Sequence, residues 1–186
     1  MSTTIARPFV DPAALKATVE AVSARRELGQ VTFTAFSESA GGLTSRTETG
    51  PLLQAGVPDE TRHGKYTLHS DEPVPLLGTD TAPSPAEYVL KALAGCYIVT
   101  LSTLAASRNI TLEKIQLTLS FDINLSGFLG IDDSVRKGAT SIQVDVELES
   151  PDAPREVLAD LAKALETTSP IRDTLANPVQ VITTLV

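Results

Sequence analysis

The chain has 186 residues, of which 42% are apolar and 20% charged, a balance typical of one soluble globular domain. Its net charge of −8 disfavours binding to nucleic-acid phosphates. A single cysteine excludes an intramolecular disulfide, and with only two histidines a zinc site is not expected. We also expect no metal or other cofactor. The first residues lack the apolar core of a secretory signal, so we expect a cytoplasmic protein.

The first part of the chain predicts a helix followed by antiparallel strands. Apolar residues at helical spacing predict an amphipathic helix over about 12–27. The expected strands are residues 30–36, 43–48 and 65–70. The expected connectors, rich in glycine and proline, are residues 50–64 and 71–83. We therefore divide the chain into an N-terminal helical extension, residues 1–29, and a domain over residues 30–186.

A long apolar helix is predicted over residues 85–106. Ser84, Pro85 and Glu87 form a capping-box start, in which the Glu87 carboxylate reaches back to the Ser84 amide. Apart from Glu87 its only charged residue is Lys91, so other elements should surround this helix. The uncharged run is shorter than the roughly 20 residues that cross a bilayer. We therefore expect a core helix rather than a membrane span.

The second half of the chain predicts two strands, two helices and a final strand. Alternating apolar residues predict strands over 115–125 and 142–148, each with one buried face. Residues 126–140 connect them through the apolar tip 128–131, which is either a flap on its own core or a lid or partner surface. The later elements are a helix capped by Asp152, a short helix from Ser169-Pro170 to about Ala176, and a strand from Val179 to Leu185. The fold class is α+β, with helices packed against antiparallel sheet.

Cys96, in the middle of the long helix, is the first candidate for chemistry. Ala92, Thr100, Thr103 and Ser107 share its helical face. Two interpretations stay open. Cys96 is either a reactive thiol beside small and hydroxyl side chains, or a small buried residue at a close helix crossing, with the hydroxyls bonded to carbonyls one turn back.

Three other residues are candidates with a structural alternative. Glu87 lies roughly 13 Å along the helix from Cys96 and on its opposite side, so within one chain it serves as a cap and reaches only a cysteine of another subunit. Ser169 is a good N-cap for the helix that follows. Arg46, on the second predicted strand, is a partner for an anion or a peroxide, or else an exposed strand arginine.

Two motifs resemble the signatures of the OsmC/Ohr family (osmotically inducible protein C and organic hydroperoxide resistance protein). They run from Ser84 to Cys96 and from Ser169 to Val179. The element order from about residue 31 also matches. The resemblance implies an intertwined homodimer, with antiparallel sheets wrapped around long central helices and active sites between the subunits. In its peroxide-reducing members, one cysteine attacks an organic hydroperoxide and a second forms a disulfide with it, while an arginine and a glutamate orient the thiolate.

The resemblance assigns roles to individual residues and also shows a departure. Cys96 matches the first cysteine, whereas Ser169 stands at the position of the second. Ala86 occupies the place where the hydroperoxide-resistance branch carries its glutamate, and Glu87 lies one place further on, as in other branches. Arg46 is the best match for the arginine.

Two functions follow from these candidates and both stay open. The first is a one-cysteine thiol peroxidase, in which a small hydrophobic peroxide oxidises Cys96 and an external thiol reduces it again. The alternative is a non-catalytic protein of the same fold that binds a small hydrophobic ligand at the dimer interface. For either function we expect a homodimer, with neither nucleic acid nor a membrane as a partner.

Overall fold

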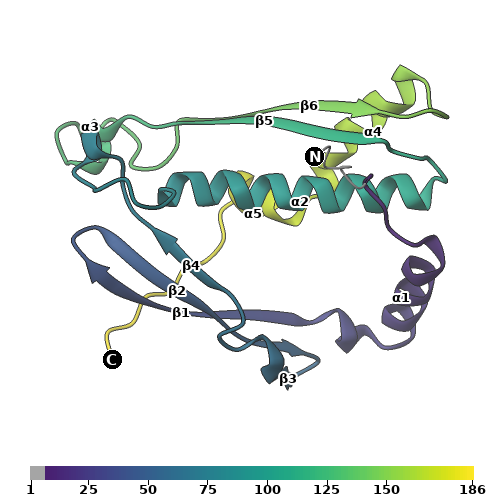
Figure 1. The fold of residues 1–186 in the computed structure, drawn as a ribbon, viewed down its shortest axis with the longest axis horizontal. Coiled ribbons are helices and arrows are strands. Elements are labelled where there is room, and N and C mark those ends of the chain that lie inside the picture. The colour runs from purple at the N-terminus through teal and green to yellow at the C-terminus, as the bar shows by residue number, and fades with distance from the viewer. Residues whose placement is uncertain (1–6) are drawn as a thin grey trace, which may run out of the picture. The chain divides into compact units, whose positions relative to one another are not determined.

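The computed structural model describes residues 7–186 and divides into two compact units (Figure 1). Of the described residues, unit 1 contains 7–12 and those from Val89 to the end, and unit 2 contains 13–88. The boundary falls after the first turn of the long helix α2 (Pro85–Ser107). Each unit has its own antiparallel sheet.

Unit 2 is an antiparallel sheet with short helices. Its helices are α1 (Pro12–Ala24), η1 (Arg26–Gly29), η2 (Glu60–Arg62) and η3 (Val74–Leu76), and its strands are β1 (Val31–Gly41), β2 (Thr44–Gln54), β3 (Val57–Asp59) and β4 (Thr67–Ser70). Strand β2 is central, since it pairs antiparallel with β1, β3 and β4. The helix and strands predicted for this part are confirmed, with shifted ends.

The expected connector over residues 50–64 is wrong, because β2 continues through Gly50 and Pro51. The register with β1 shifts between Phe33 and Ala35, and the Thr34 hydroxyl donates to the Pro51 carbonyl oxygen at 2.6 Å. A Cβ on Gly50 would lie 2.3 Å from the Thr34 Oγ1 atom, so only glycine fits there. The irregular register therefore accommodates two residues that normally interrupt a strand.

Asp71 is a fully buried carboxylate that organises the connector before α2. Its Oδ2 atom accepts hydrogen bonds from both the backbone N–H and the hydroxyl of Thr79 and of Thr81, at 2.6–3.1 Å. Its Oδ1 atom accepts from the backbone N–H of Glu72 at 2.8 Å. These bonds, that of the Thr79 hydroxyl above all, hold the pKa of the Asp71 carboxyl well below its usual range.

We expect Asp71→Asn to lower the thermal unfolding midpoint at pH 7, because an amide group cannot accept all five bonds. The folded-state pKa is depressed, so this stabilisation is present above the unfolded-state pKa of about 3.9 and is lost as the pH falls. The difference between wild type and variant should therefore narrow below about pH 4. Asp80→Asn, at an exposed position of the same connector, is the matched control. Equal midpoints for Asp71→Asn and wild type at pH 7 would contradict this role.

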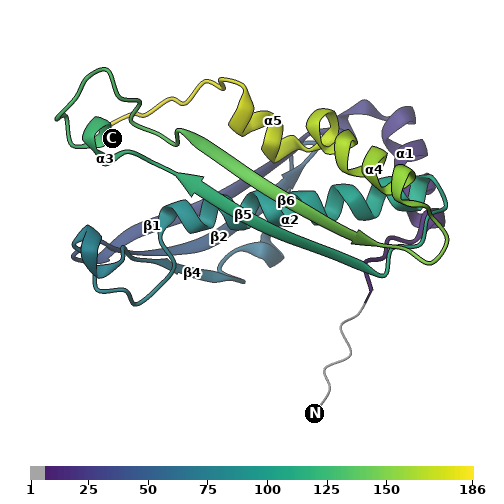
Figure 2. The same cartoon turned by 90° about the horizontal axis from the view of Figure 1, so that it is seen from above.

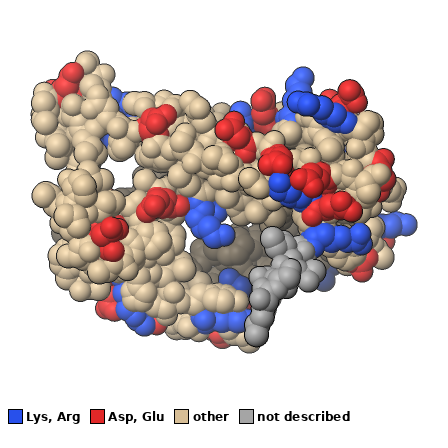
Figure 3. All heavy atoms as spheres, turned by 45° about the horizontal axis from the view of Figure 1, so that its top comes forward, with Lys and Arg blue, Asp and Glu red and all other residues tan. Residues whose placement is uncertain are grey.

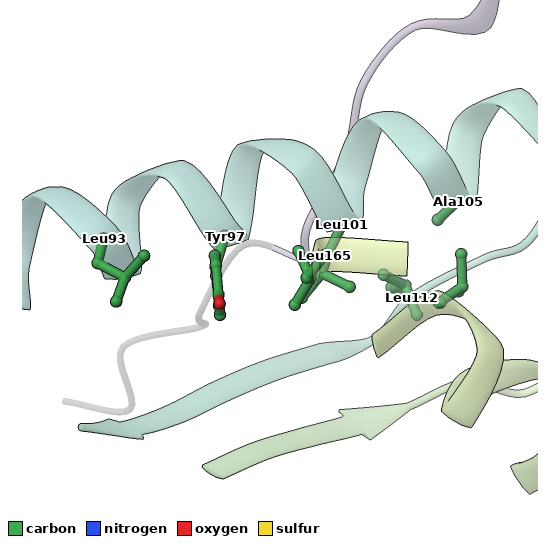
Figure 4. Packing of buried hydrophobic residues seen from close by; sticks show 7 residues of the cluster. Leu93, Tyr97, Leu101, Ala105, Leu112 and Leu165 are labelled. Atoms are coloured by element: carbon green, nitrogen blue, oxygen red, sulfur yellow. The ribbon is translucent and has the colours of Figure 1, made fainter. Parts of the chain in front are cut away.

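Unit 1 is built on α2, which lies along the two-stranded antiparallel ribbon of β5 (Lys114–Asp122) and β6 (Ser141–Glu149) (Figure 2). The helices α3 (Leu125–Phe128), α4 (Arg155–Thr168) and α5 (Pro170–Ala176) complete it. Figure 4 shows Leu93, Tyr97, Leu101 and Ala105 on one side of α2, facing the ribbon. With Leu112, Leu161 and Leu165 they form the buried core.

Three predictions for this unit are wrong. The strand from residue 115 ends at Asp122 rather than 125, because the Asn124 side chain caps α3. Asp152 does not cap α4. Its carboxylate accepts the Thr111 backbone N–H at 3.1 and 3.2 Å, and the N-cap is Pro154. Residues 179–185 form no strand, since nothing in the described chain pairs with them (yellow in Figure 1).

Helix α2 begins with the predicted capping box. The Ser84 backbone N–H donates to Glu87 Oε2 at 2.7 Å, and the Glu87 N–H donates to Ser84 Oγ at 3.3 Å. Among the described residues it is the one helix long and apolar enough to cross a membrane, by length and composition alone. Core helices pass the same test. Within the described chain one side of α2 is buried, whereas Ile98 and Val99 on it are exposed, so the prediction that other elements surround this helix is met on one side only.

We expect Glu87→Gln to change stability little, because an amide oxygen still accepts the Ser84 N–H, whereas Glu87→Ala should cost on the order of 1 kcal/mol. Urea unfolding of the three proteins measures the difference. If Glu87→Gln instead abolished the reactivity of the Cys96 thiol at unchanged stability, a catalytic role for the carboxylate would be the better account.

Candidate active site

The structure brings together Cys96 and Ser169, one residue from each of the two motifs. Cys96 lies in the middle of α2, and Ser169 is the residue between α4 and α5. The Cys96 Sγ and Ser169 Oγ atoms are 3.2 Å apart, although 73 positions separate them in the chain. Cys96 is partly exposed, whereas Ser169 is 2% exposed. The site is therefore a thiol with a buried hydroxyl beside it.

Ser169 is held in place by the helix that it begins. Its side-chain oxygen accepts the backbone N–H of Arg172 at 3.3 Å, as an N-cap does, and Pro170 occupies the first helical position. A thiolate has no proton, so in that form the hydrogen bond between the two side chains runs from the Ser169 hydroxyl to Cys96 Sγ. The arrangement thus supplies one fixed donor to a cysteine thiolate.

The thiol faces an open apolar groove of about 560 Å³. Its lining includes Ala92, Gly95, Val99, Thr100, Pro170 and Ile171. Of the hydroxyls that line the groove, that of Thr103 donates to the Val99 carbonyl at 2.8 Å and that of Thr168 to the Ala164 carbonyl at 2.6 Å. Because these hydroxyls are occupied by backbone, the groove offers chiefly apolar surface to a ligand next to the sulfur.

The other two candidates have partners within unit 2. Arg46 on β2 forms ion pairs with Glu48 and, at 3.4 Å, with Glu38. Glu87 is engaged in the capping box with Ser84. Glu87 thus has the cap contact offered as its alternative role, and Arg46 is a partly exposed strand arginine paired with two carboxylates of its own sheet.

Two residues near the thiol were not predicted to be functional. Tyr97, next to Cys96, is buried, and burial raises the pKa of its hydroxyl, which the nearby Arg172 guanidinium partly offsets. Arg172 also donates from Nη1 to the Glu166 carbonyl at 2.7 Å. Arg172 lies within the second motif, and its charge there was the one feature of the sequence that could have marked it as a functional candidate. Within residues 7–186, no cluster of three His, Cys, Asp or Glu side chains is arranged to hold a metal.

The long helix packs on an antiparallel ribbon and carries a cysteine at its middle, and the capped start of a second helix lies against the sulfur. These features define a thiol protein of α+β architecture. The sequence model of the OsmC-like protein family matches residues 78–184. The chain therefore belongs to the OsmC-like family. No curated protein sequence matches it.

Solved structures share the fold at low sequence identity. An OsmC-like protein from Mycoplasma pneumoniae superposes with a TM-score of 0.58 at 16% identity, over 78% of this chain and 87% of that one. An organic hydroperoxide resistance protein OsmC from Legionella pneumophila gives 0.55 at 17% identity, over 77% and 88%. An OsmC-like protein from Vibrio cholerae gives 0.55 at 12% identity, over 77% and 92%. At these identities the likeness establishes the fold.

Proposed function

We propose that this OsmC-like protein is a one-cysteine thiol peroxidase that reduces organic hydroperoxides. The observation that carries the proposal is the Cys96 sulfur, which is partly exposed, borders an apolar groove and lies 3.2 Å from a hydroxyl that donates to the thiolate form. Reactive cysteines require both access and a stabilised thiolate. The Legionella protein of the same fold, described as an organic hydroperoxide resistance protein, supports the choice of substrate.

The proposed cycle uses one protein thiol. The Cys96 thiolate attacks the terminal oxygen of the hydroperoxide, an S–O bond forms as the O–O bond breaks, and the departing alkoxide takes a proton to leave as an alcohol. Cys96 is then a sulfenic acid, and Ser169 cannot resolve it because a hydroxyl forms no disulfide. An external thiol attacks the sulfenic sulfur, water leaves, and a second external thiol releases Cys96 as a thiol and forms the external disulfide.

We further propose that the working form is a homodimer. Residues 178–186 are extended, make no hydrogen bond in the described chain and expose Val179, Val181, Ile182 and Leu185. The ribbon β5–β6 has two strands only, so each has an unpaired edge within residues 7–186. An unpaired segment and unpaired edges favour strand pairing between two copies. Phe33 and Phe36 of unit 2, which are also exposed, add apolar surface for a partner.

We place this reaction in the cytoplasm, because the cycle consumes an external thiol. Small thiols are kept reduced in that compartment, and the single cysteine requires no oxidising environment. A sulfenic acid without a protein thiol to resolve it is otherwise exposed to further oxidation. The proposed function therefore requires an external thiol that reduces Cys96 after each turnover.

Treatment with a limiting amount of cumene hydroperoxide should add one oxygen atom to the intact mass of the protein. If a small thiol is present, the product should instead be its mixed disulfide with Cys96. The measurement is intact-protein mass spectrometry, and Cys96→Ser is the control, since it should show neither product. Its stability by urea unfolding verifies that the fold is retained.

An unmodified wild-type Cys96, under conditions that fully oxidise a free thiol, would rule out the peroxidase. The apolar groove beside Cys96 would then serve the alternative function, which is the binding of a small hydrophobic molecule without turnover.

A further inference from the structure

Unit 1 contains a second cavity, of about 450 Å³, between α2, the ribbon β5–β6 and α5. It does not include Cys96. Its apolar wall is formed by Val89, Leu93, Phe121, Ile142, Val144 and Leu175. Cavities of this size that are apolar and carry a few polar groups are typical of small-molecule sites.

Two guanidinium groups line this cavity, from Arg136 of the connection between β5 and β6 and from Arg172 of α5. No carboxylate lines the cavity, and neither arginine forms an ion pair with any residue that the structure describes. Elsewhere charges of opposite sign are interspersed, as Figure 3 shows for one face. Two guanidinium groups in a lining without a carboxylate give this cavity a positive charge, in a chain whose net charge is −8.

Tyr97 adds a polar group to the same cavity. Its ring extends from α2 towards the ribbon, with the hydroxyl at its far end (Figure 4). Arg172 is half-buried and lies close enough to influence this hydroxyl, whereas Arg136 is exposed. A planar guanidinium binds a carboxylate through two parallel N–H donors, and a tyrosine hydroxyl adds a third. The cavity therefore combines donors for one anionic head group with an apolar wall.

We propose that this cavity binds a small amphipathic anion, namely a carboxylate carried on an apolar chain. Arg136, Arg172 and Tyr97 hold the head group, and the chain lies against the apolar residues of α2 and the ribbon. The site is separate from the Cys96 groove, so the proposal does not depend on the peroxidase function. Cys96→Ser should bind the ligand as the wild type does.

Calorimetric titration of the whole protein with octanoate tests the proposal. We expect saturable binding of octanoate, and binding at least about tenfold weaker for octanol and for acetate, which lack the charge and the chain respectively. Arg172→Gln and Arg136→Gln should each weaken octanoate binding about tenfold, because each loses charge-assisted hydrogen bonds. Lys137→Gln removes one positive charge from the same connection without changing the lining, and should bind as the wild type does.

Three results would overturn the proposal: no binding of octanoate to the wild type, equal binding of octanol and octanoate, or equal loss of binding in Lys137→Gln and the arginine variants. Thermal unfolding of each variant verifies its fold. Arg172→Lys, which keeps the charge, should recover part of the affinity, and failure to recover any of it would mean that Arg172 acts through the fold rather than on the anion.

Discussion

Replacing Ser169 by cysteine should convert the Cys96 site into a disulfide-forming pair. The Cys96 Sγ and Ser169 Oγ atoms are 3.2 Å apart, so a sulfur at residue 169 needs to move by only about 1 Å to reach the S–S bond length of about 2.05 Å. Limiting hydroperoxide should then remove two hydrogens from the intact mass instead of adding oxygen. Closing a loop of 73 residues should stabilise the oxidised variant by about 4 kcal/mol relative to its reduced form, in the chain-entropy account.

The reduced variant is a useful reference by itself. Cysteine is a poorer N-cap than serine, so reduced Ser169→Cys should be about 1 kcal/mol less stable than wild type. The double variant Cys96→Ser, Ser169→Cys has the cap change without a partner thiol and should lose no hydrogens. A Ser169→Cys protein that gained oxygen and formed no disulfide would show that the two positions are not within disulfide reach in solution.

Val181→Asp should shift the protein from dimer to monomer, whereas Gln180→Asp should leave the dimer intact. If residues 178–186 pair with a second copy, Val181 becomes buried, and a carboxylate there is left without a partner. The expected change is at least about tenfold in the dimer dissociation constant. Light scattering during size-exclusion chromatography distinguishes one copy of the 19.6 kDa chain from two.

Removing residues 179–186 is the stronger form of the same test, with loss of the dimer as the expected result. A wild-type protein that is monomeric at micromolar concentration would contradict the homodimer directly. If both Val181→Asp and the truncated protein remained dimers, the second copy would contact other surfaces, and the C-terminal segment would have no part in assembly.

Local sequence was sufficient for the elements whose signals involve neighbouring residues. The capping box of Ser84 and Glu87 marks the start of α2, and alternating apolar residues define β5 and β6. The start of α5 at Ser169-Pro170 is equally local, since one side chain and one proline determine it. Cys96 was identifiable for the same reason, as the single thiol in a long apolar helix.

Tertiary structure decided whatever depends on residues far apart in the chain. Gly50 and Pro51 continue a strand because Thr34 of the neighbouring strand supplies a hydrogen bond, and residues 179–185 form none because a strand requires a partner. Asp152 stabilises the turn at Thr111 rather than a helix start. The packing of α5 and the ribbon against α2 is likewise not encoded by any local pattern. This packing brings the Ser169 hydroxyl beside the Cys96 sulfur and places Arg136 and Arg172 in the lining of one cavity.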